Sequence, residues 1–425
     1  MHVALFVHRY PPAVGGCEAY VARLAAHLAS CGDGVTVWTS TAVDLEAMWR
    51  RGFEETSAAE TTSGVTIRRF APLRFPARRY ALKALSLIPV PRWQALTLPC
   101  NPVCPEMWRA AGQYDGRLDA VHAFAFPYSF VAAAGLRLAR RRGVPFLLTP
   151  FLHLGDPTDP ADRTRRQYTS APLRWLLRQA DRVFVQTPSE FRAVVELGVP
   201  EGRVVLQGLG VDPAECTGGN RMTARAAWGV APDEVVFGHL ANLSEEKGAV
   251  DLLRAAAVAQ AAGHRFRVVL AGPDMPNFCR FWDALPDKSG ITRLGRLTDA
   301  EKRDFFAGID AFALPSRTDS FGLVLLEAWA NGKPNVCYRA GGPADLIHDG
   351  EDGFLARCGD VAELARHLGR LAADPTLRQK LGETGRARVG RDFRWDDKLE
   401  LVRRETSRLR PMTTSSPVGW PVPGS

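Results

Sequence analysis

Short apolar runs alternate with segments of helical periodicity, and this alternation limits the possible folds more than any other feature of the sequence. The runs HVALFV (2–7) and GVTVWTS (34–40) flank a loop, HRYPPAVGG, and a helical pattern over 17–30. Similar strand and helix pairs recur over 119–142 and 182–198, with the run PFLLTP between them. The order strand, helix, strand with short loops predicts a parallel sheet covered by helices on both faces.

A second series of the same kind follows the sequence GLGVDP. Its apolar runs EVVFGHL, FRVVLAG, AFALP and KPNVCY are separated by helical segments. We therefore predict an α/β fold of two doubly wound, Rossmann-like domains, over 1–207 and 208–390, that face each other across a cleft. Gly-rich residues 208–220 are the expected hinge, 391–410 carry a charged amphipathic helix, and the Pro-, Ser- and Gly-rich tail 411–425 is expected to be disordered.

Composition excludes several other classes of protein. Apolar residues make up 46% of the chain and charged residues 24%, which is typical of a folded globular protein. No run approaches the roughly 20 apolar residues that a membrane span needs, and the N-terminus does not resemble a signal peptide. The eight cysteines are scattered, so neither a zinc site nor a disulfide framework is expected, and reduced thiols predict a cytoplasmic protein.

The net charge of +8 lies entirely in the first half of the chain. Residues 1–205 hold 25 Lys and Arg against 17 Asp and Glu, and the remainder holds 29 of each sign. Such a half can face an anionic partner, such as a membrane surface, an acidic glycan or a polyphosphate, although a solvated basic surface explains it equally simply. No helix-turn-helix, zinc-finger or RNA-binding signature accompanies the charge, so nucleic acid is not an expected partner.

One region, 72–105, does not follow the alternation. It contains several prolines around a short stretch, 77–88, with Arg and Lys on one side and Leu on the other. A basic amphipathic segment of this kind can lie on an anionic membrane or form a wall for a second substrate. Ordinary packing of a loop and a helix on the sheet is the alternative.

In an open parallel sheet, ligands gather where strands end and helices begin, which selects three loops. In the first, Gly15 and Gly16 precede a helix, so backbone N–H groups there can face an anion without a Cβ in the way. In the second, NLSEEKG, Ser244 is a potential helix cap and Lys247 lies near a helix start. The helix dipole makes a cation unfavourable there unless an anion lies nearby. The simpler interpretations are that the two glycines only allow the turn to form and that Lys247 is a solvated surface lysine.

The third loop opens the stretch SRTDSFGLVLLEAWANGKP, residues 316–334. Asp319 and Ser320 are potential caps of a helix that begins near Gly322 and presents free N–H groups. Glu327 then falls inside an otherwise apolar helix, and an unpaired buried carboxylate costs several kcal/mol. Two neighbouring hydroxyls of a ribose would satisfy it, and an ion pair with a cation from another element is the alternative.

Four segments resemble, in order and spacing, the retaining glycosyltransferases of family 4, which have the GT-B fold. They are PPAVGGCEAYVARLAAHLAS, LSEEKGAVDLLRA, the long block from FALPSRTDSFG to EDGFL, and FRWDD. The resemblance runs from the first strand to the final helix and leaves out 44–110 and the tail. It implies that a nucleotide diphosphate sugar, linked to UDP, GDP or ADP, lies mostly against the second domain. The acceptor, a hydroxyl of a glycan, a lipid-linked molecule or a small molecule, would lie on the first domain.

The resemblance also implies roles for individual residues. Glu327 would bind the ribose, Asp319 the transferred sugar, and the N–H groups of 321–323 the diphosphate, while the helix after Trp395 would cross back onto the first domain. His153 stands where the family places a histidine beside the sugar. The implied catalytic residues are His153, Lys247 and Asp319, and Arg296 and Leu297 would border the base. The implied donor-binding set is Gly15, Gly16, Asn242, Lys247, Asp319, Ser320, Phe321, Gly322, Leu323 and Glu327.

Two residues depart from the family pattern. Asp319 stands where Glu is usual, which shortens the side chain by one methylene, and Asn242 stands where an Arg is common. Loss of a charged donor at a developing anion costs on the order of 3 kcal/mol unless Lys247, the helix start, Arg9 or Arg296 replaces it.

The expected reaction transfers a hexosyl-type group with retention of the anomeric configuration. The leaving diphosphate would remove the acceptor proton, and no metal or other cofactor is expected because Lys247 and the helix start neutralise the leaving group. The alternative is a nucleotide-sugar-binding scaffold that has lost catalysis, which the two departures favour. A nicotinamide dehydrogenase is not expected, because the first strand–helix turn lacks a complete GxGxxG. Peripheral contact of the basic half with the inner face of a membrane is a further expectation.

Overall fold

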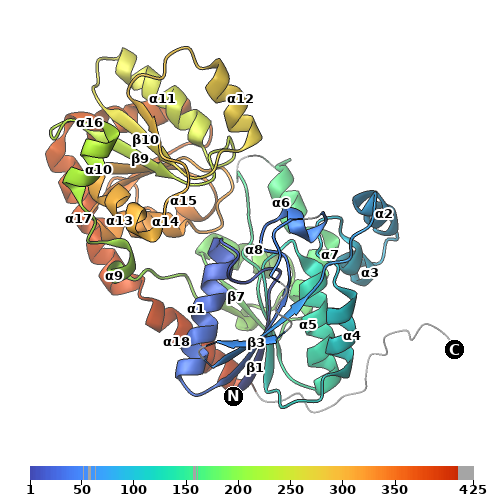
Figure 1. Ribbon diagram of the computed structural model, residues 1–425. Helices are drawn as coiled ribbons and strands as arrows, with labels where there is room; N and C mark the ends of the chain where they lie inside the picture. The colour runs from blue at the N-terminus through green and yellow to red at the C-terminus, as the bar shows by residue number, and fades with distance from the viewer. Residues whose placement is uncertain (51, 56–58, 63, 157–158, 160, 410–425) are drawn as a thin grey trace.

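Two parallel sheets, one in each lobe of the molecule, organise the fold in the computed structural model (Figure 1). The structure describes residues 1–50, 52–55, 59–62, 64–156, 159 and 161–409. The predicted tail 411–425 lies outside the described residues. Within them, no helix combines the length and the apolar character that crossing a bilayer requires.

The first sheet has eight strands in the order β3-β4-β2-β1-β5-β6-β7-β8. All neighbours are parallel except the β3 and β4 pair, which is antiparallel. Alternate residues of β1 enter different cores, Val3 and Leu5 on one face and Ala4 and Phe6 on the other, because helices cover both faces. The strands are β1 (His2–Phe6), β2 (Gly34–Ser40), β3 (Ala59–Thr62), β4 (Val65–Phe70), β5 (Ala120–Phe124), β6 (Phe146–Thr149), β7 (Arg182–Val185) and β8 (Val204–Leu206).

The helices of the first lobe connect these strands. They are α1 (Gly16–Ser30), α2 (Arg78–Leu85), α3 (Pro91–Thr97), α4 (Pro105–Gln113), α5 (Ser129–Arg142), α6 (Arg163–Tyr168), α7 (Ala171–Gln179) and α8 (Pro188–Glu196), with short 3₁₀ turns at Glu46–Met48 and Glu201–Arg203. Helix α5 is buried along most of its length because it lies on the sheet, where Gly135 lets it approach Phe6.

The second sheet has six parallel strands in the order β11-β10-β9-β12-β13-β14. Its strands are β9 (Val236–Leu240), β10 (Arg267–Ala271), β11 (Ile291–Arg293), β12 (Ala311–Leu314), β13 (Asn335–Tyr338) and β14 (Gly353–Ala356). Its helices are α9 (Pro213–Cys216), α10 (Arg221–Trp228), α11 (Ala249–Ala261), α12 (Pro276–Ala284), α13 (Asp299–Gly308), α14 (Leu323–Ala330), α15 (Gly341–Leu346), α16 (Val361–Ala373) and α17 (Pro375–Asp392). The fold is therefore the predicted pair of Rossmann-like lobes.

Two segments of chain pass side by side between the lobes. The amide of Val211 donates to the carbonyl of Phe393 at 2.8 Å, and a Cβ on Gly210 would lie 2.6 Å from the Trp395 nitrogen. Helix α18 (Trp395–Arg408) follows and packs on α1 of the first lobe, with Leu399 and Val402 buried between them. The predicted domain limits and the hinge at 208–220 remain predictions, and the first limit falls just after β8.

The lobes also touch directly on the side of the sheets where α8 begins. Asp345 of α15 accepts hydrogen bonds from the Ser189 amide at 2.8 Å and from the Ser189 hydroxyl at 2.9 Å. Ser189 lies in the first turn of α8, so a carboxylate of the second lobe satisfies a helix N-terminus of the first.

The irregular region 72–105 forms a helical hairpin, α2 and α3, which packs on the domain as the simpler interpretation expected, while the membrane or acceptor role stays a prediction. Its base packs on the domain: Arg78 is buried and donates to the Asn101 carbonyl, and α3 contacts α5 and α7. Its tip stays tied together, since Trp93 Nε1 donates to the Leu85 carbonyl at 2.9 Å. The outer face is apolar and exposed, with Tyr80 79% and Leu87 76% accessible.

Candidate active site

The start of α14 is the centre of the candidate site. Gly322 is the N-cap with φ 92°, a left-handed conformation that favours glycine, and no side chain caps the helix. The loop before it is pressed against α15, because a Cβ on Gly342 would lie 2.4 Å from the Phe321 Cα. The expected caps are therefore wrong: Asp319 Oδ1 accepts from the Phe321 amide at 3.3 Å, upstream of the helix. An uncapped first turn leaves N–H groups for an anion.

Lys247 and Asp319 form an ion pair beside this helix start. Lys247 Nζ lies 2.7 Å from Asp319 Oδ2, and both side chains are partly buried. The loop that carries the lysine is held close, since a Cβ on Gly248 would lie 2.0 Å from the Pro315 carbonyl oxygen. The sequence position of Ser244 suggested that it caps α11, but the N-cap is Gly248. The Ser244 hydroxyl instead accepts from the Lys247 amide at 3.1 Å. Burial alone would raise the pKa of Asp319, but the charge and hydrogen bond of Lys247 lower it, so the carboxylate is ionised.

His153 reaches the same place from the first lobe. It follows β6, and its Nδ1 is hydrogen-bonded to the carbonyl of Thr318, one residue before Asp319. Because a carbonyl only accepts, Nδ1 carries the proton and Nε2 is left as an acceptor. Burial and then the charge of Lys247 lower the pKa of His153, so the ring is neutral near pH 7. Tyr168 lies against the ring with centroids 4.8 Å apart. The three residues that the sequence singled out for catalysis thus come together across the two lobes.

The Gly15–Gly16 loop of the first lobe also lies close to the start of α14. A Cβ on Gly16 would lie 4.0 Å from Leu323 Cδ1 in the first turn of α14. A Cβ on Gly15 would lie 2.2 Å from Glu18 Oε2, which explains the first glycine as a steric need. Glu18 is buried and pairs with Arg9 at 2.6 Å and His8 at 3.3 Å. Despite burial, the hydrogen bond from His8 and the charge of Arg9 lower the pKa of Glu18 to about 2, so the Arg9 charge is already neutralised.

Glu327 has a cationic partner that sequence reasoning missed. Lys302 Nζ of α13 lies 2.6 Å from Glu327 Oε1, so the ion pair that was the alternative to a ribose is present. Among the described residues only Oε1 has a hydrogen-bond partner, which leaves Oε2 for a hydroxyl. Burial raises the pKa of Glu327 in spite of Lys302. Thr298 and Glu301 form a capping box that fixes the start of α13, but this pattern does not identify the side chain that Lys302 meets.

The expected base pocket residues lie just before α13. Arg296 is exposed, and Leu297 is half-buried against the core. Their loop therefore leads into the helix that carries Lys302, next to Glu327.

A cavity of about 430 Å³ adjoins Lys247 in the second lobe. It is lined by Asn242, Ser244 and Lys247 from the loop before α11 and by Met275, Asn277 and Arg280 from the cap and first half of α12. Arg280 was not expected from the sequence, since no motif marks it. It places a guanidinium on the cavity that Asn242 lines. The family pattern commonly has an arginine at the position of Asn242. Ser320 lies in the loop between Asp319 and Phe321, and its side chain is partly buried.

Comparison with known proteins identifies the family. The family described as "Glycosyl transferase 4-like domain" matches residues 15–210, and "Glycosyl transferases group 1" matches 220–388, so together they span both lobes. A D-inositol 3-phosphate glycosyltransferase of Thermobifida fusca is 27% identical over 87% of this chain and 83% of its own. One from Acidothermus cellulolyticus is 29% identical over 91% of this chain and 84% of its own.

Solved structures agree on the fold. Sucrose-phosphate synthase from Thermosynechococcus elongatus superposes with a TM-score of 0.73 at 22% identity, over 96% of this chain and 98% of the other. Anabaena HepE in complex with UDP-glucose superposes with a TM-score of 0.70 at 19% identity, over 96% and 100%. The chain belongs to the group 1 glycosyl transferases, family 4, with the GT-B fold, and it is a retaining glycosyltransferase that takes its sugar from a nucleotide sugar.

Proposed function

We propose that the donor's diphosphate binds between the Gly15–Gly16 loop and the first turn of α14, with its ribose on Glu327 and its base beside Arg296 and Leu297. The single observation that carries this proposal is the convergence of His153, Lys247 and Asp319 at the uncapped helix start. The free N–H groups of the helix start, with the Lys247 ammonium beside them, favour an anion there. The transferred sugar then lies between His153 and Asp319.

In the reaction, the bond between the sugar and the diphosphate breaks ahead of attack, which gives an oxocarbenium-like sugar and new negative charge on the diphosphate. Lys247 and the α14 N–H groups stabilise that charge because they are fixed before the reaction begins. The leaving phosphate oxygen takes the proton of the acceptor hydroxyl on the same face, so the configuration is retained. Neutral His153 orients the sugar through Nε2, since its Nδ1 is held by Thr318.

The donor is a UDP-, GDP- or ADP-linked hexose, and UDP-glucose, which a superposable structure contains, is the first to test. The purified chain is incubated with labelled nucleotide sugars and a panel of hydroxyl acceptors, and the anomeric configuration of the product is read by NMR. The proposal predicts transfer with retention, together with slow hydrolysis of the same donor. Tight binding with neither transfer nor hydrolysis would instead support a binding scaffold.

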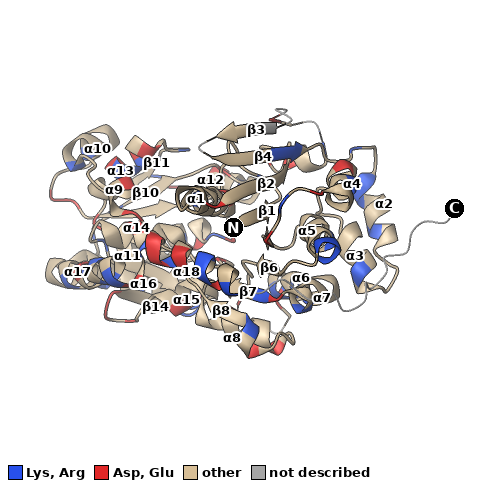
Figure 2. Cartoon of the chain, turned by 90° about the horizontal axis from the view of Figure 1, so that it is seen from below, with Lys and Arg blue, Asp and Glu red and all other residues tan. Residues whose placement is uncertain are grey.

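We also propose that the acceptor side of the enzyme works at the inner face of an anionic membrane, with the α2–α3 hairpin as the contact. Leu87 and Ile88 at its tip are exposed, and Tyr80 projects from α2. Arg79 and Lys83 of α2 are also exposed, and Figure 2 shows Lys and Arg positions in blue along this helix. Apolar side chains enter the interface while each nearby cation adds about 1 kcal/mol of attraction to anionic lipid.

Vesicle co-sedimentation tests this contact. Wild-type protein is expected to bind vesicles that contain phosphatidylglycerol, weakly at high salt, and to ignore pure phosphatidylcholine. Leu87→Asp should reduce binding at least tenfold, whereas Met222→Asp, at an equally exposed apolar position on α10 of the other lobe, should not. Equal loss in both variants, or none in either, would overturn the assignment of the hairpin.

A further inference from the structure

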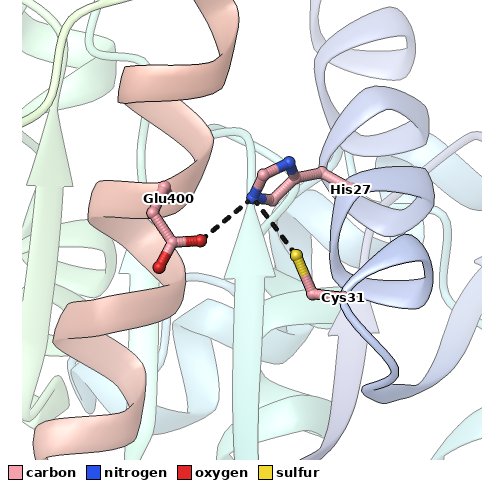
Figure 3. Close-up of side chains that lie close together, drawn as sticks. All are labelled: His27, Cys31 and Glu400. Atoms are coloured by element: carbon pink, nitrogen blue, oxygen red, sulfur yellow. Dashed lines mark hydrogen bonds and ion pairs between the residues drawn. The ribbon is translucent and has the colours of Figure 1, made fainter.

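Three potential metal ligands meet where the crossover helix packs on the first lobe. His27 and Cys31 lie four residues apart near the end of α1, so they share one face of the helix, and Glu400 approaches them from α18 (Figure 3). His27 Nε2 lies 3.3 Å from Glu400 Oε2 and 3.9 Å from Cys31 Sγ. The three ligand atoms lie within 4.8 Å of one another. None of these residues belongs to the candidate active site.

The spacing matches what a tetrahedral zinc ion requires. With bonds of about 2.0–2.1 Å to nitrogen or oxygen and about 2.3 Å to sulfur, ligand atoms of a tetrahedral site lie about 3.3–3.8 Å apart. The two distances from His27 Nε2 are already near this range. Only Cys31 needs to approach the pair, and it is exposed at the end of α1.

The surroundings hold the carboxylate in place. Arg403 Nη1 lies 3.5 Å from Glu400 Oε1, the oxygen that does not face His27, and Arg403 Nε donates to Asp33 at 2.7 Å. The arginine is therefore shared between two carboxylates, and it orients Glu400 without using the ligand oxygen. The charged groups near the cluster are Arg403 and Asp33, which lie beside Glu400, and Arg23 and Asp396, which line the same hollow as His27.

We propose that His27, Cys31 and Glu400 bind one Zn²⁺ ion, with water as the fourth ligand. Imidazole, thiolate and carboxylate together favour zinc over hard cations such as Mg²⁺ and Ca²⁺. Zinc binds the thiolate, so the thiol proton of Cys31 leaves to solvent on binding. The ion joins α1 to α18 and fastens the crossover helix to the first lobe. The role is structural and independent of sugar transfer. The scattered cysteines gave no sign of it, because only one of the ligands is a cysteine.

Zinc binding to the full-length chain tests the proposal. The protein, kept reduced with a phosphine, is titrated with Zn²⁺ against a chromophoric chelator, and melting is followed with zinc and with EDTA. The expected result is one Zn²⁺ per chain, a melting temperature raised by about 5 °C at saturating zinc, and an X-ray absorption spectrum with one sulfur ligand.

Variants distinguish this site from adventitious binding. His27→Gln, Cys31→Ser and Glu400→Gln should each weaken zinc binding at least tenfold, with melting in EDTA unchanged because all three positions are partly or fully exposed. Cys279→Ser, which removes a partly buried thiol on α12, should leave binding unchanged. Equal zinc affinity in the His27 variant, or a zinc-dependent dimer by sedimentation, would overturn the site within one chain.

Discussion

Replacing Glu327 with glutamine separates the two roles that this residue can have. If its purpose is the ion pair with Lys302, Glu327→Gln should unfold more easily and bind the donor normally. If its purpose is the ribose, the variant should keep its stability and lose donor affinity. The structure allows both effects to be given a size.

The expected change in stability is small. The pair is 2.6 Å long, but Lys302 is 32% exposed and Glu327 18% exposed, and partly exposed ion pairs contribute about 0–1 kcal/mol. Burial raises the pKa of Glu327 in the folded protein above its pKa in the unfolded chain. Ionisation of Glu327 therefore disfavours folding as the pH rises above the pKa of the unfolded chain. The glutamine variant lacks this penalty. Its stability relative to wild type should therefore improve between pH 4 and pH 7.

The expected change in binding is larger. A hydrogen bond to a charged group contributes about 1.5–3 kcal/mol, so losing the carboxylate should raise the Kd for a nucleotide diphosphate about 10- to 150-fold. Urea unfolding at pH 4 and pH 7 and calorimetric titration with UDP measure the two quantities. Lys302→Gln is the matched control, since it removes the same ion pair and leaves the carboxylate. A stability loss above about 3 kcal/mol in both variants, with unchanged UDP affinity, would refute the ribose role.

Three further predictions follow from the same geometry. Lys247→Ala should lower kcat about 10²- to 10³-fold, because it removes a fixed cation at the leaving diphosphate. Lys333→Ala, at a lysine away from Asp319, should change kcat little. Equal losses of kcat in the two variants would contradict the role of Lys247. Gly342→Ala should lower both stability and donor affinity, because its Cβ would lie 2.4 Å from the Phe321 Cα. Gly390→Ala in α17, where a Cβ would have no neighbour within 4 Å, should stabilise the protein by about 0.5–1 kcal/mol. Thermal melting with and without UDP measures both effects. Burial lowers the pKa of His122 to about 3, so below pH 6.5 the unfolded chain binds a proton at this residue that the folded chain does not. The wild-type protein therefore loses unfolding free energy as the pH falls, and His122→Phe should reduce that loss between pH 6.5 and 4.5 by about 2–3 kcal/mol. Equal dependence of the unfolding free energy on pH in the two proteins would contradict the shift.

The sequence predicted most central strands of both sheets and missed β3, β4, β8, β11 and β14, of which only β4, between β3 and β2, is not at an edge. Strands β1, β5, β9 and β12 are buried on both faces, so their apolar runs stand out. Strand β8 has a single neighbouring strand, β11 is partly exposed, and β3 pairs only with β4, so their short, mixed runs resemble loops. The edge strand β14 was missed although it is buried, because four residues between turns carry little periodicity.

The candidate site was predictable where local spacing determined it. Gly15, Gly16, Lys247 and Glu327 all belong to short loop and helix patterns, and the structure brings their segments to one place. Lys302 and Arg280 were not predictable in this way, because nothing near them in the sequence records which side chain or cavity they meet after folding. The predicted caps failed for a related reason: in both loops a glycine with positive φ takes the N-cap position that a polar side chain was expected to fill.

A crystal structure of this protein with a nucleotide diphosphate tests the central claim most directly. The account predicts phosphate oxygens within hydrogen-bond distance of the amides of 322–324 and of Lys247, and ribose hydroxyls on Glu327, with Lys302 either sharing that carboxylate or released from it. A nucleotide bound elsewhere, with Glu327 still paired only to Lys302, would contradict it.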